Sequence, residues 1–162
     1  MDRRLLAIYL NDHLAGSTAG VELARRARGN NRGTPYHDPL QQTATEIAED
    51  RAALLDVMRR LGVGRDPVKE WAGWLAEKGG RLKRNGRLTG YSPLSRVVEL
   101  EVLALGVEGK RSLWRALQRS VGGDPLLDGV DLEELLRRAD RQRRRLEQLR
   151  VSAADEAFGG PA

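Results

Sequence analysis

The stretch EIAEDRAALLDVMRRLG, residues 46–62, carries the pattern that decides the fold. Its apolar residues recur at helical spacing, which predicts a long helix with one buried face. They are Ile47, Leu54, Leu55, Met58 and Leu61. Glu46 and Glu49 stand one turn before most of this apolar run. Polar side chains directed at the core of a helix bundle are costly unless they are paired, so they mark a site or the remains of one.

Two other predicted helices show the same kind of interruption. His13 lies among apolar residues at helical spacing, and Gln142 falls between Leu135 and Leu146. We therefore expect His13, Glu46, Glu49 and Gln142 to bring polar groups toward one core.

Helix start and stop signals divide the chain into four long helices. The signals are a capping residue before proline, or an aspartate with glutamate three residues later. The predicted spans are about 2–28, 38–61, 93–121 and 131–150. A short helix with Trp71 and Trp74 is predicted between the second and third, followed by the exposed connection KGGRLKRNGRLTG, residues 78–90.

The order of these elements predicts an all-α fold, because no strand-like alternation is present. Two helices, a long connection and two more helices are typical of two antiparallel hairpins joined by a crossover. This is the arrangement of a ferritin-like four-helix bundle, here with a short extra helix in the crossover. We expect one bundle domain over residues 1–150 and a flexible C-terminal tail over 151–162.

Composition excludes several kinds of site. The 162 residues contain no cysteine and only two histidines. The lack of cysteine excludes disulfides and thiolate metal sites. No apolar run approaches the ~18 residues that cross a membrane, so we expect a cytoplasmic protein of bacterial type. The net charge of +5 comes from 28 basic and 23 acidic residues. That balance permits contact with a polyanion but predicts a surface of mixed sign.

Residues 5–150 resemble the ferritin-like superfamily, which includes bacterioferritins, rubrerythrins and small stress-associated bacterial bundles. The resemblance implies a di-iron site with one glutamate from the first and third helices and a Glu-x-x-His pair from the second and fourth. In YLNDHLAG, His13 falls at the place of the first glutamate. In the second helix Glu46 is retained, and Glu49 stands where histidine is expected.

The third and fourth helices depart further from the family pattern. In LALGVEGKRSLWRAL, Gly106 occupies the ligand position, although a shift of two residues offers Glu108 and a shift of seven offers Glu99. In RRADRQRRRLEQLR, Ala139 and Gln142 stand at the glutamate and histidine positions. The carry-over therefore predicts that the di-iron centre is lost.

Three interpretations of His13 remain open, and the third is that rotation of its helix simply leaves the side chain exposed. In the first, it is a core histidine that hydrogen-bonds to Glu46 or Glu49. In the second, His13, Glu46 and Glu49 form a mononuclear site for a single Fe, Mn or Zn ion, with Gln142 as a polar partner in the core.

The arginine run of the last helix is typical of a solvated face, with glutamates available at helical spacing. The alternative is a nucleic-acid contact that joins this helix to the basic connection. Its residues would be Arg81, Lys83, Arg84, Arg87, Arg141 and Arg144. No aromatic residue is interleaved with them, which disfavours stacking on single-stranded bases.

These patterns predict a non-enzymatic, stress-related binding or scaffold protein without a cofactor. We expect a homodimer, with Trp71 and Trp74 at or near its interface, and an unidentified protein partner. The alternatives are a protein that binds or stores a single metal ion and a DNA-associating protein.

Overall fold

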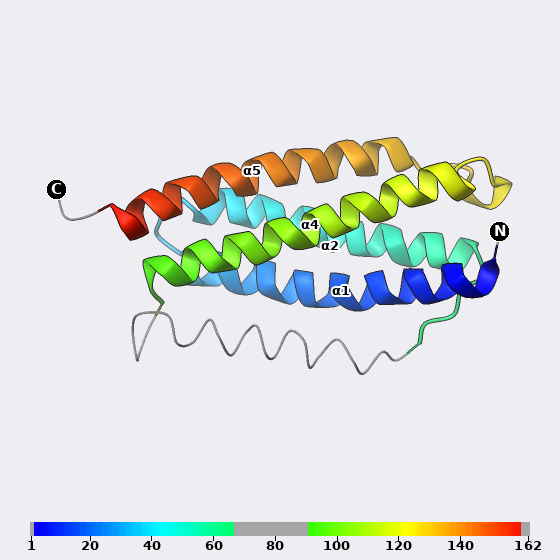
Figure 1. Ribbon diagram of the computed structural model, residues 1–162, viewed down its shortest axis with the longest axis horizontal. Helices are drawn as coiled ribbons and strands as arrows, with labels where there is room; N and C mark the ends of the chain where they lie inside the picture. Colours follow the sequence, from blue (N-terminus) through cyan, green and yellow to red (C-terminus); the bar gives the residue numbers. More distant parts are fainter. Residues whose placement is uncertain (1, 67–90, 160–162) are drawn as a thin grey trace.

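The computed structural model describes residues 2–66 and 91–159. This part of the chain contains four long α-helices and one short 3-10 helix, and it has no strand (Figure 1). The elements are α1 (Arg3–Asn30), α2 (His37–Arg60), α4 (Pro93–Val121), η1 (Pro125–Leu127) and α5 (Leu132–Phe158). The all-α fold class is confirmed. Within the described residues, no helix is both long and apolar enough to cross a membrane.

Local capping explains where most of these helices begin. The Ser92 hydroxyl accepts a hydrogen bond from the Ser95 amide at 3.1 Å, and Pro93 opens α4 as predicted. Asp131 caps α5 as predicted by accepting from the Glu134 amide at 2.8 Å. The second helix differs, since α2 already begins at His37 and its N-cap residue makes no side-chain capping bond.

The last helix is longer than the sequence predicted. We expected it to end near Arg150, but α5 continues to Phe158. Ala153 is fully buried, and it repeats the seven-residue spacing of Ala139 and Leu146 on the same face. The segment 151–158 is therefore part of the bundle, and its description as a flexible tail is corrected. Residues 160–162 lie outside the described residues.

The helices form two antiparallel hairpins, α1–α2 and α4–α5 (Figure 1). The start of α4 lies beside the end of α1, where Asn31 Nδ2 donates to Tyr91 Oη at 3.0 Å. The end of α2 lies beside the α4–α5 turn, where Arg60 donates to the Asp128 carbonyl at 2.9 Å. Consequently α2 and α4 run in the same direction. The short crossover helix that we predicted, with Trp71 and Trp74, falls in residues 67–90, outside the described residues.

Arg96 joins three parts of the bundle at the end where α4 begins. Its guanidinium lies 4.3 Å from the centre of the Tyr36 ring. It also donates to Asn31 Oδ1 at 2.7 Å and to Glu156 Oε2 at 2.5 Å. Stacking and charge-assisted hydrogen bonds from one side chain thus connect α4 with the α1–α2 turn and with α5.

The core consists of two apolar clusters. The first lies toward the α1–α2 turn and includes Ile47, Val107 and Leu146. The second lies toward η1 and includes Leu54 and Trp114. Along α2 and α4, polar residues stand between the members of one cluster and those of the other, at Asp50 and Lys110.

Candidate functional site

The strongest candidate for a site is a group of polar side chains between the two apolar clusters. It consists of Asp50 from α2, Lys110 from α4, and Arg138 and Gln142 from α5, which we call the central polar layer. Asp50 is 2% exposed and Gln142 is 0% exposed. A charged group at this depth requires partners, because burying it unpaired costs several kcal/mol.

The apolar stripes of the helices place these residues inward. Asp50 lies between Ile47 and Leu54, at a spacing of three and four residues on the buried face of α2. Lys110 occupies the equivalent place between Val107 and Leu113 on α4. Gln142 was predicted to reach the core, whereas Asp50, Lys110 and Arg138 were missed.

The four side chains of the layer form hydrogen bonds with one another. Asp50 Oδ2 accepts from the Lys110 ammonium and from Gln142 Nε2, the latter at 3.0 Å. Asp50 Oδ1 accepts from Arg138 Nε at 2.7 Å. Lys110 Nζ also donates to Gln142 Oε1 at 2.5 Å. The Asp50 carboxylate is therefore held by two cations and one amide.

Burial affects the protonation of Lys110. Desolvation lowers the pKa of its ammonium below the ordinary lysine value, and the nearby Arg138 charge acts in the same direction. The Asp50 carboxylate opposes this shift through its charge and its hydrogen bond, without cancelling it. The proton on Lys110 is thus held less tightly than that of an exposed lysine.

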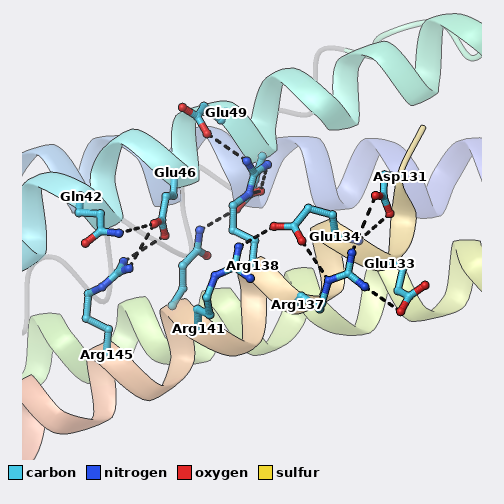
Figure 2. A network of polar contacts seen from close by, with 12 residues as sticks. Gln42, Glu46, Glu49, Asp131, Glu133, Glu134, Arg137, Arg138, Arg141 and Arg145 are labelled. Carbon is cyan, nitrogen blue, oxygen red and sulfur yellow. Dashed lines mark hydrogen bonds and ion pairs between the residues drawn. The ribbon is translucent and has the colours of Figure 1, made fainter. Parts of the chain in front are cut away.

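Ion pairs continue from the layer along the contact between α2 and α5, which we call the α2–α5 seam (Figure 2). Arg145 binds Glu46 with both terminal nitrogens, at 3.0 and 3.2 Å, and Arg138 binds Glu49 at 3.0 Å. Desolvation, the largest single influence, raises the pKa of Glu46, but its bonds with Arg145 and Gln42 bring the pKa below the ordinary value. Glu46 and Glu49 are thus occupied by arginines of α5.

His13 does not join these glutamates. Its ring packs edge-on against Tyr9, with ring centres 4.6 Å apart, and it makes no hydrogen bond to Glu46 or Glu49 in the described structure. Neither the core hydrogen bond nor the three-residue metal site that we expected is formed. The reason is helix rotation, since both glutamates face α5 while His13 remains beside Tyr9 on α1.

The described residues do not reproduce the two-iron centre that the family resemblance implies. Among the described residues, no group of three or more histidines and carboxylates is placed to hold a metal ion. Glu108, the nearer alternative ligand in the third helix, pairs with Arg111 at 3.1 Å, and Glu99, the other, pairs with Arg26 at 3.0 Å. The donor set does not fit such a centre.

We expect a pH dependence of stability from His13. Burial lowers its pKa, although the charge of Asp12 partly opposes the shift. The His13 imidazole therefore takes up a proton at higher pH in the unfolded chain than in the folded chain. The contribution of His13 to the free energy of unfolding is fully present above the unfolded pKa of about 6.5 and falls as the pH drops through that value. Urea unfolding of wild type and His13→Gln on both sides of this pH tests it. An unchanged pH dependence in the variant would contradict the assignment.

The basic residues are mostly neutralised where the structure describes them. Arg137 pairs with Glu133 and Glu134, and Arg141 pairs with Glu134 at 2.6 Å (Figure 2). This agrees with the solvated face that we predicted. Arg144 is exposed and has no ion pair among the described residues. The other proposed nucleic-acid contacts, Arg81, Lys83, Arg84 and Arg87, lie outside the described residues.

Comparisons of the chain with protein-family models, curated proteins and solved structures gave no match.

Proposed function

We propose that this chain is a ferritin-like bundle that has lost its di-iron centre and acts as a non-enzymatic binding or scaffold protein. The observation that carries the proposal is the occupation of the buried central layer by Lys110 and Arg138. Both cations are bound to Asp50, the buried carboxylate of the layer.

Electrostatics support this assignment. A divalent ion bound at Asp50 would lie beside two positive side chains, and such repulsion is poorly screened inside a protein. It would also have to displace donors from both oxygens of Asp50. The layer satisfies its own charges and offers no open ligand position.

Topology supports the ferritin-like part of the proposal. Two antiparallel hairpins with α2 and α4 running in the same direction require a long crossover, as in ferritin-like folds. Simple up-and-down bundles connect each helix to the next by a short loop and lack this parallel pair.

A central ionic layer also suits a scaffold. Buried ion pairs contribute little net stability compared with apolar residues, but in some proteins they fix which surfaces pair and in which register. In this chain the layer requires Asp50 of one hairpin to meet Lys110, Arg138 and Gln142 of the other. It would thereby fix the alignment of the two hairpins and keep the outer surface in one shape.

The iron reaction tests this function. Ferrous iron added in air to the purified protein is expected to oxidise no faster than in buffer, because the layer provides no site for two irons. Faster oxidation that is abolished by His13→Ala would contradict the proposal and support the alternative of a residual metal site at His13, Glu46 and Glu49. Circular dichroism of the variant establishes that its helical content is unchanged.

We also propose a homodimer. Leu5 and Ile8 of α1 and Leu105 of α4 are exposed, and apolar residues of this size are common at interfaces. Sedimentation equilibrium at micromolar concentration is expected to give twice the chain mass of 18.0 kDa. A single species of the monomer mass would refute the dimer.

A further inference from the structure

We propose that Lys110 and Gln142 join in an intramolecular isopeptide bond between α4 and α5, with release of ammonia and with Asp50 as the proton carrier. This modification goes beyond the proposed function: it would turn the Lys110 ammonium of the central polar layer into an amide and leave Arg138 as the cation bound to Asp50.

The three groups have the contacts that the reaction requires. Lys110 Nζ, the nucleophile, lies 2.5 Å from Gln142 Oε1 and is thus next to the carboxamide that it would attack. The same oxygen of Asp50, Oδ2, accepts from Lys110 Nζ and from Gln142 Nε2. One carboxylate oxygen therefore contacts both the nitrogen that must lose protons and the nitrogen that must leave.

The surroundings favour this chemistry over that of exposed side chains. An amine attacks only when it is neutral, and burial lowers the pKa of Lys110, which makes the neutral form more accessible. Gln142 is fully buried, so bulk water does not compete for its carbonyl carbon. The helices hold the partners together, which replaces a slow encounter in solution by a reaction within one molecule.

The step balances without any further reactant. Asp50 takes a proton from the Lys110 ammonium, and the nitrogen lone pair attacks Gln142 Cδ to form the new C–N bond. Asp50 then delivers the proton to Gln142 Nε2, the Cδ–Nε2 bond breaks, and ammonia departs. The second proton of the attacking nitrogen passes through Asp50 to the departing ammonia, which leaves as ammonium, so the product is a neutral amide beside the Asp50 carboxylate.

The other charges around Lys110 act in both directions. Arg138 of α5 disfavours the ammonium by its charge, and Glu46 of α2 favours it. Arg138 donates to Oδ1 of Asp50 and leaves Oδ2 to the two reacting nitrogens. We expect a slow reaction that follows folding, because Lys110 must become neutral before it attacks and the Glu46 charge favours its charged form.

The bond would cross-link the second hairpin near its middle. It would close a loop between residues 110 and 142 and restrict the unfolded chain in the manner of a disulfide, in a protein with no cysteine.

The intact mass of the purified, fully incubated protein tests the proposal. We expect wild type to weigh less than its sequence mass by one ammonia molecule. Lys110→Arg keeps the charge but is expected to have its full sequence mass, as is Asp50→Asn. Gln148→Leu, a matched change at an exposed glutamine of the same helix, is expected to retain the loss. A wild-type mass equal to the sequence mass would overturn the proposal, whether or not any variant folds.

Peptide mapping identifies the atoms involved. Trypsin is expected to release peptide 97–111 uncleaved at Lys110 and carrying the dipeptide Gln142-Arg143 as a branch. Ammonia can also be lost by cyclisation at Asn85-Gly86, a sequence prone to it. A mass loss that maps to that pair, with residues 97–110 and 142–143 recovered separately, would likewise overturn the isopeptide bond.

Discussion

Replacing Asp50 with alanine is expected to lower the free energy of unfolding by about 3–5 kcal/mol, as when one partner of a buried ion pair is removed. The variant would leave the Lys110 ammonium and the Arg138 guanidinium close together with their shared anion gone. Loss of the proposed isopeptide bond would add to this effect. Denaturant unfolding followed by circular dichroism measures it.

Glu49→Ala is the matched control for Asp50→Ala. Glu49 is the neighbouring carboxylate, and it binds the same arginine. Its side chain is 56% exposed, so its removal is expected to cost less than about 1 kcal/mol. Similar losses of unfolding free energy in the two variants would mean that the burial of the carboxylate does not determine the strength of these ion pairs.

Replacing Trp114 with alanine is expected to cost about 3–5 kcal/mol, the range for a large buried aromatic side chain. Trp114 is 0% exposed and belongs to the apolar cluster near η1. Trp114→Phe is expected to cost much less. The Trp114 indole Nε1 is buried without a hydrogen-bond partner in the described structure. Phenylalanine lacks this unpaired donor, so the variant loses only part of the side-chain volume.

Comparison of the unfolding midpoints of the two Trp114 variants separates packing from hydrogen bonding. If Trp114→Phe lost nearly as much stability as Trp114→Ala, the indole N–H would have to make a bond that the structure does not contain.

Helix positions were predictable from the sequence because capping and proline signals are local. Ser92-Pro93 and Asp131 mark helix starts by bonds to residues within one turn, and the structure contains those bonds. The end of α5 was missed because small residues such as Ala153 carry a weak apolar signal. Its burial depends on contacts with other helices.

The central polar layer was predicted in kind, but Gln142 was the one member of it that was predicted. Glu46 and Glu49 were chosen on α2, whereas the buried carboxylate is Asp50, which lies between Ile47 and Leu54. Neighbouring positions on a helix point about 100° apart, and the spacing of apolar residues in the sequence does not resolve that angle.

The arginines were misjudged for a different reason. Arg138 and Arg145 belong to a run that is largely exposed, yet their side chains reach across to carboxylates of α2. Which member of such a run turns inward depends on the acid opposite it, and that pairing joins residues about 90 positions apart in the sequence. No local pattern contains this information.

The central claim is that Lys110 and Arg138 occupy the place in the interior where a metal ion would bind. Elemental analysis of protein purified without chelator tests this claim most directly. The proposed occupation of the layer by Lys110 and Arg138 predicts only traces of transition metal per chain after extensive dialysis. More than half an equivalent of bound iron, manganese or zinc would contradict it, because an ion held that firmly would require a set of ligands that this arrangement does not provide.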